Sequence, residues 1–122
     1  MTPILILDGG LGTSLEQKYH VRFGPSTPLW STDAVVTTPH TVLACQADFA
    51  RVPVDVLLTA TYQVSERGFA QTGSGIDRAG IPEMLERAVC IAEAAARQGG
   101  SGSGTSVALS LGPYGATMTP SQ

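Results

Sequence analysis

Three short clusters contain the residues of this sequence whose types and spacing could do chemistry. They are Asp8-Gly9-Gly10, Thr61-Tyr62-Gln63 and Gly112-Pro113-Tyr114. Each cluster directly follows a short apolar run of the kind that forms a buried strand. Ligands of parallel α/β sheets bind beyond the carboxyl ends of the strands, so the three clusters are candidates for one shared site.

The first cluster favours a ligand that carries both charges. The Asp8 carboxylate would accept hydrogen bonds from an ammonium group, whereas it would repel a phosphate. Free backbone N–H groups of Gly9 and Gly10, at the start of a helix, can hold a carboxylate. The turn therefore suits a zwitterion. A tight strand-to-helix turn with Asp8 as its cap explains the same residues and stays open at this point.

A dinucleotide site is a weaker interpretation of the same glycines. A G-x-G-x-x-G pattern can begin at Gly10 and Gly12, but Leu15 stands where the third glycine belongs. No lysine follows the glycines, which excludes a P-loop. A small nucleotide-binding α/β domain is kept as an alternative.

The elements that must position these clusters alternate along the chain. Strands are expected at residues 4–7, 54–59 and 106–111. Helices are expected at residues 11–19, from Thr38–Pro39 until Pro53 closes the helix, at 65–71 and at 82–98. Residues 22–32 are expected to be a loop and 99–104 a flexible connection. This order predicts right-handed βαβ units and a parallel sheet.

Composition narrows the function classes. The chain has 122 residues, 43% hydrophobic and 14% charged, which fits one small ordered domain. The net charge of -3 argues against nucleic acid as a partner. No apolar run approaches the ~20 residues of a membrane span, and the N-terminus lacks the pattern of a signal peptide, so we expect a cytoplasmic protein. Cys45 and Cys90 are expected to be reduced, buried core residues.

Four sequence blocks resemble the homocysteine S-methyltransferase family. They occur in family order over nearly the whole chain: residues 6–16 (ILDGGLGTSLE), 28–31 (PLWS), 58–63 (LTATYQ) followed by Gly68-Phe69, and 110–116 (SLGPYGA). The resemblance implies an α/β fold, the N-terminal portion of a (β/α)8 TIM barrel. Residues 1–122 would form a partial homocysteine-binding domain, with about three parallel strands, truncated after the third, and no barrel closure.

The resemblance also implies a reaction. Family members transfer a methyl group to the thiol of homocysteine, which gives methionine, from donors such as S-methylmethionine, S-adenosylmethionine or betaine. Their zinc, which would hold the sulfur as thiolate, is bound by three cysteines in later segments. Cys45 and Cys90 match none of these positions. We therefore assign no catalytic residue and no metal ligand here, and expect the chain alone to be inactive.

Six residues carry over as substrate-binding candidates. Asp8 matches the position that binds the amino group, and Gly9 and Gly10 match the turn that receives the carboxylate. Thr61, Tyr62 and Gln63 match a strand end that contacts substrate or donor. The alternative for these last three is a structural role: the Thr61 hydroxyl and the Gln63 amide would form hydrogen bonds with the loop backbone, and the Tyr62 ring would pack.

Two further residue assignments and one other function class complete the expectations. Gly112-Pro113-Tyr114 is expected to shape its turn and Trp30 to pack. The other function class is a non-catalytic amino-acid binder or a half barrel that depends on a partner.

Overall fold

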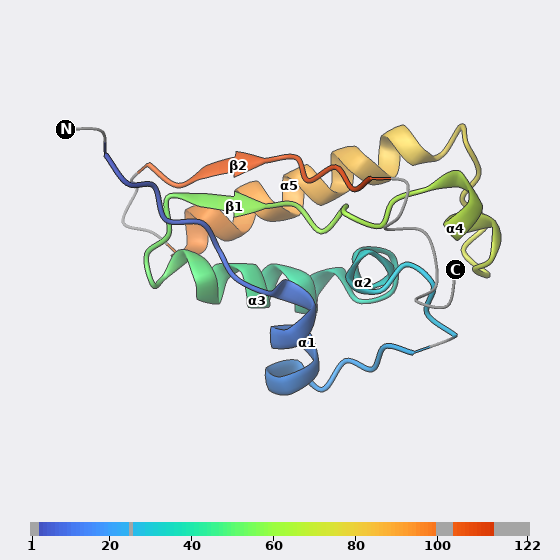
Figure 1. Ribbon diagram of the computed structural model, residues 1–122, viewed down its shortest axis with the longest axis horizontal. Coiled ribbons are helices and arrows are strands. Elements are labelled where there is room, and N and C mark those ends of the chain that lie inside the picture. Colours follow the sequence, from blue (N-terminus) through green and yellow to red (C-terminus); the bar gives the residue numbers. More distant parts are fainter. Residues whose placement is uncertain (1–2, 25, 100–103, 114–122) are drawn as a thin grey trace.

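The computed structural model describes residues 3–24, 26–99 and 104–113. Within these ranges helices precede and separate the two strands, as in an α/β protein (Figure 1). In chain order they are α1 (Leu11–Tyr19), α2 (Ser31–Thr37), α3 (Pro39–Ala50), β1 (Val56–Leu58), α4 (Glu66–Ala70), α5 (Ile81–Gly99) and β2 (Ser106–Ala108).

The sheet is parallel and unclosed. Strand β1 pairs with β2 in a register that places Val56 opposite Ser106 and Leu58 opposite Ala108. On its other side β1 meets the segment 4–8, through an isolated parallel bridge between Leu7 and Val56. The spatial order is therefore segment 4–8, β1, β2, and the chain leaves each of them toward the same edge.

Helices α3 and α5 cover one face of this sheet (Figure 1). They pack closely because small side chains line their contact: a Cβ at Gly99 would lie 2.8 Å from the carbonyl oxygen of Ala47. Leu57 is fully buried beneath them. The cluster there consists of Ala47, Ala50, Val54, Leu57 and Ala95. Burial of these apolar side chains stabilises the short sheet.

The expected helices are confirmed with small changes at their ends. The helix expected at 11–19 has those bounds, and the other three correspond to α3, α4 and α5. Thr38 is the N-cap residue of α3, as expected. Its hydroxyl forms no capping hydrogen bond, however, and instead donates to the Ala34 carbonyl at 3.4 Å. Both expected strands are shorter in the structure. Only the centre of the strand expected at 54–59 forms, and only the first half of the strand expected at 106–111.

Two expectations about burial are wrong. The sequence predicts a strand buried on both faces at residues 4–7, yet Ile4 is 88% exposed and Leu7 55%. An apolar run indicates extended backbone, but burial needs covering elements, and no described residue covers this segment. Cys90 is exposed, because it lies on the solvent side of α5, whereas Cys45 is buried as expected.

Helix α2 was missed. Its residues are mostly Thr and Val, which have weak helix propensity. It forms because Thr32, Ala34 and Val35 are buried against the rest of the domain, and the Thr32 hydroxyl donates to the Ala60 carbonyl at 2.9 Å. Tertiary packing therefore decides this helix, and the local sequence does not predict it.

Two expectations concern residues that the structure does not describe: most of the connection 99–104, and Tyr114 in the third cluster. In the described ranges, no helix combines the length and the hydropathy needed to cross a bilayer.

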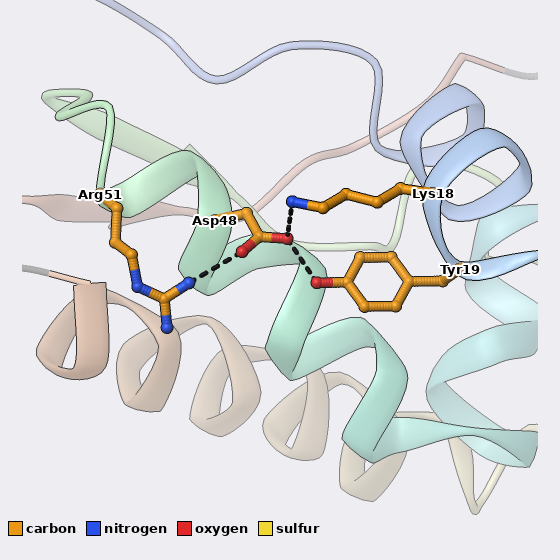
Figure 2. Close-up of polar contacts among 4 residues, drawn as sticks. All are labelled: Lys18, Tyr19, Asp48 and Arg51. Atoms are coloured by element: carbon orange, nitrogen blue, oxygen red, sulfur yellow. Dashed lines mark hydrogen bonds and ion pairs between the residues drawn. The ribbon is translucent and has the colours of Figure 1, made fainter.

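Helix α1 is tied to α3 by a cluster of charged and polar side chains (Figure 2). The Asp48 carboxylate accepts hydrogen bonds from Lys18 at 2.7 Å, from Arg51 at 2.8 Å and from the Tyr19 hydroxyl. These contacts lower the pKa of Asp48, and the bond to Asp48 raises the pKa of Tyr19 to about 12. The cluster therefore ties the last turn of α1, a helix that begins directly after Gly10, to α3.

Candidate functional site

The regular hydrogen bonding between segment 4–8 and β1 stops at Asp8. Up to that point it follows a parallel ladder: the Val56 N–H donates to Ile6, and the Asp8 N–H donates to the Val56 carbonyl at 3.1 Å. Continued by one step, the ladder would join Leu58 N–H to the Asp8 carbonyl and Gly10 N–H to the Leu58 carbonyl. Neither of these two bonds is formed.

Side chains take the place of both missing partners. The Leu58 N–H donates to Asp8 Oδ2 at 3.1 Å, and Gln46 Nε2 on α3 donates to the Leu58 carbonyl at 2.9 Å. We call this place, made of Asp8, Gln46 and Leu58, the first seam. Its effect is to satisfy the backbone of β1 while the chain turns away at Gly9.

The Asp8 carboxylate is poised for a positively charged partner. Its Oδ1 atom is buried and has no hydrogen-bond partner among the described residues. Burial raises the pKa of Asp8, although the hydrogen bond from Leu58 acts in the opposite direction. An ammonium group at Oδ1 would supply both the missing donor and the missing positive charge.

The backbone N–H groups next to this carboxylate are available. In the described part of the chain neither Gly9 nor Gly10 donates its N–H to another group. Gly10 is the N-cap of α1, so these N–H groups lie at the positive end of a helix of nine residues. At Gly9 the space is tight, because a Cβ there would lie 3.1 Å from the Phe49 ring. The turn thus presents donors at a position where only glycine fits easily.

The hydrogen bonding between β1 and β2 ends in a similar way. The last regular bond joins the Thr59 N–H to the Ala108 carbonyl at 3.0 Å. After it, the Ser110 N–H donates to Thr59 Oγ1 at 3.0 Å and Thr61 Oγ1 donates to the Ser110 carbonyl at 2.7 Å. The two hydroxyls lie 2.7 Å apart, and Thr59 is the donor between them because the only proton of Thr61 is already used. We call Thr59, Thr61 and Ser110 the second seam.

The three residues of the second cluster are placed differently. Thr61 is 1% exposed and its hydroxyl belongs to the second seam. Tyr62 is 45% exposed. Gln63 lines a hollow of about 280 Å³ together with Gly10, and its Oε1 is buried without a partner among the described residues. The structure therefore brings Gly10 and Gln63 to one hollow. Asp8 lies two residues before Gly10 in the sequence.

An aromatic pair forms part of the same hollow. The rings of Phe23 and Trp30 lie 6.3 Å apart, centroid to centroid, and both line it, as does Glu16. Trp30 was assigned to packing, but it is 46% exposed and its φ of 47° is rare for a residue with a side chain. Such backbone strain is commonly found at ligand sites.

Sequence reasoning missed Gln46, Thr59 and the cavity role of Trp30. Gln46 left a usable signal, since it lies three residues after Leu43 and four before Ala50 on the buried face of α3. A polar residue in a buried stripe needs a partner. Trp30 left no such signal, because its backbone conformation cannot be inferred from residue type.

The cysteines of this chain are poor metal ligands. Burial, with the nearby Asp48 charge, raises the pKa of Cys45 to about 11, which disfavours a thiolate. Cys90 is exposed on α5. Across residues 3–24, 26–99 and 104–113, no three side chains of the His, Cys, Asp or Glu type gather as metal ligands would.

The chain matches known proteins over almost all its length. The family profile for homocysteine S-methyltransferases matches residues 5–122. The chain is 35% identical to betaine-homocysteine S-methyltransferase of Drosophila melanogaster over 123 residues, which is 95% of this chain and 37% of that protein. It is 32% identical to homocysteine S-methyltransferase 2 of Arabidopsis thaliana, over 93% of this chain and 37% of that protein.

A solved structure is similar in fold as well. The metallated form of the homocysteine methyltransferase MmuM from Escherichia coli has a TM-score of 0.78 and 32% sequence identity. The match covers 95% of this chain and 40% of MmuM. The chain thus spans well under half the length of these relatives.

Proposed function

The chain belongs to the homocysteine S-methyltransferase family, and from this premise we propose that it supplies the amino-acid-binding part of a homocysteine methyltransferase domain. In that domain the methyl group of a donor would pass to the thiol of homocysteine, which forms methionine. The sheet of segment 4–8, β1 and β2 would be the opening part of a (β/α)8 barrel. A free thiol substrate suits the reducing cytoplasm, where we place this chemistry.

The observation that carries this proposal is the first seam. Asp8 Oδ1 has a buried lone pair without a donor, and the Gly9 and Gly10 N–H groups beside it have no acceptor within the described residues. An α-amino acid carries an ammonium group and a carboxylate on one carbon, so it can satisfy both at once. Asp8 would bind the ammonium group and the two glycines the carboxylate.

We assign the adjoining hollow to the methyl donor. S-methylmethionine, S-adenosylmethionine and betaine all carry a positive charge at the atom that bears the methyl group. The faces of aromatic rings attract such cations, and Phe23 and Trp30 line the hollow with Glu16. Gln63 would use its unpartnered Oε1 there, Tyr62 lies exposed at the same strand end, and Thr61 supports the strand end through the second seam.

A family metal does not fit the described residues of this chain. Zinc sites use three or four ligands, with cysteines as thiolates, whereas Cys45 is buried with a raised pKa and Cys90 lies exposed on another helix. We therefore assign no metal-dependent step to the residues of this chain. On this proposal, the chain alone binds homocysteine but does not turn it over.

A second candidate, a half barrel that works only with a partner chain, is favoured by one observation. Large apolar side chains are exposed on segment 4–8 and after β2: Ile4, Leu5, Ile6, Leu7, Leu109 and Leu111. Exposed patches of this kind mark surfaces that another element covers.

Calorimetric titration tests the proposal. The purified chain should bind homocysteine, with Asp8→Ala abolishing the heat of binding and Cys45→Ala leaving it unchanged. Mass spectrometry of chain, homocysteine and S-methylmethionine should detect no methionine. Absence of homocysteine binding by the folded wild-type chain would overturn the proposed site, and methionine formation would overturn the assignment of turnover to a larger assembly.

A further inference from the structure

Gln46 has no place in the site as the sequence predicts it, yet the first seam depends on it. It lies on α3, is 1% exposed and donates from Nε2 to the Leu58 carbonyl. That carbonyl is the acceptor which a continued ladder would give to the Gly10 N–H. The Gln46 amide therefore donates to the carbonyl that a backbone donor would otherwise use.

The use of the Gln46 amide in place of a backbone donor is unfavourable for the Gln46 side chain itself. Because Leu58 accepts from Nε2, the orientation of the amide is fixed, and Oε1 is left buried without a partner in the described part of the chain. A buried acceptor without a donor lowers stability. An apolar residue of similar size would avoid this loss, but it would not donate to the Leu58 carbonyl. The amide at this position is thus explained by what it does to Leu58 and not by packing.

We propose that Gln46 is a positioning residue for the amino-acid site: by taking the Leu58 carbonyl, it keeps the Gly10 N–H out of the sheet and available to the carboxylate of the substrate. The inference rests on the proposed function for its consequence, but not for its geometry. Asp8 performs the matching task on the other side of Leu58, where its Oδ2 accepts the N–H. The two side chains together end the ladder one step early.

The substitution that tests this is Gln46→Met, which conserves volume and removes the donor. In the variant the Leu58 carbonyl lacks the Gln46 donor, and we expect the Gly10 N–H to donate to this carbonyl instead. Amide hydrogen exchange measured by NMR should show fast exchange of Gly10 in the wild type and at least about tenfold slower exchange in Gln46→Met. The amide of Asp8, already bonded to Val56, serves as internal reference.

Homocysteine affinity provides the second measurement. Gln46→Met should lower it by about tenfold or more, which corresponds to one lost charge-assisted contact. Gln46→His should restore most of the affinity, because an imidazole N–H can donate to the same carbonyl. Cys45→Ala, also buried on α3, is the matched control: it should lower thermal stability without changing the affinity.

The outcomes separate the two claims. If the wild type does not bind homocysteine, the proposed function fails, and the exchange of Gly10 alone decides the role of Gln46. If Gly10 exchanges as fast in Gln46→Met as in the wild type, the positioning role is wrong, whatever the affinity. An affinity loss that Gln46→His does not restore would also overturn it.

Discussion

The first and second seams solve the same structural problem with different chemistry. At both, a parallel ladder ends early and side-chain atoms replace the next backbone partners. The second seam uses two hydroxyls in a ring from the Ser110 N–H through Thr59 and Thr61 back to the Ser110 carbonyl, so each hydroxyl both donates and accepts a hydrogen bond. The first seam uses a carboxylate and an amide, and each leaves one buried oxygen without a partner among the residues that the structure describes.

On the proposed function, the difference separates a structural strand end from a binding one. A network whose hydroxyl protons are all used holds β1 and β2 together and leaves no side-chain donor for a ligand. A network with unpaired buried oxygens lowers the stability of the free protein. The protein regains this stability when a ligand supplies the missing donors. Residues that look alike in sequence, polar and directly after a strand, can therefore have opposite roles.

The largest expected effect distinguishes the two seams by affinity. Asp8→Asn keeps the shape of the side chain but removes the charge that an ammonium group requires, so homocysteine affinity should fall about 100-fold, or about 2.7 kcal/mol. Thr61→Val, the matched change in the second seam, should change affinity by less than about threefold. Calorimetry on both variants checks this, and equal losses would remove the distinction.

Stability should show the reverse order. Thr61→Val leaves the Ser110 carbonyl without its donor and the Thr59 O–H without its acceptor, so it should lower the free energy of unfolding by about 1–3 kcal/mol. Asp8→Asn removes a charge that is disfavoured by burial and should cost less than this. Urea unfolding followed by circular dichroism measures both. A more stable Thr61→Val variant would show that the hydroxyl ring is not structural.

The pH dependence should reveal the first seam alone. Burial raises the pKa of Asp8, so its contribution to stability is complete at pH values below its unfolded pKa and is lost as the pH rises through the folded one. Binding of an ammonium group needs the charged form, so affinity should rise over the same interval, by up to about tenfold per pH unit. Both trends should vanish in Asp8→Asn, and their persistence there would assign them to another group.

The smallest effect is expected outside both seams, at the Asp48 cluster of Figure 2. The Lys18 side chain is 61% exposed, so its ion pair with Asp48 is screened by solvent. Lys18→Met should lower the free energy of unfolding by about 0–1 kcal/mol, and added salt should reduce the difference further. A loss comparable to that of Thr61→Val would mean that this anchor controls the glycine turn.

The elements and the family could be read from the sequence because both depend on local pattern. Helices α1, α3, α4 and α5 follow from apolar spacing and from residues such as Pro39. Helix α2 could not be predicted, since burial of Thr32, Ala34 and Val35 outweighs weak propensity. The exposure of Ile4 could not be predicted either, because an apolar run does not specify what covers it.

The candidate site was predictable in position but not in its internal connections. Asp8 and its glycines follow from residue type at a strand end. The partnership of Asp8 with Leu58, 50 residues away, depends on where a ladder stops. Gln46 and the hydroxyl ring share this property: their roles come from backbone partners that the sequence does not show.

NMR of the isotopically labelled chain, titrated with homocysteine, tests the central claim most directly. Before ligand is added, the Gly9 and Gly10 amides should exchange rapidly while the Asp8 amide is protected. With homocysteine, the resonances of both glycines should shift and their exchange should slow, as the carboxylate takes their hydrogen bonds. Glycine amides that are already protected without ligand, or that do not move while other resonances report binding, would contradict the account.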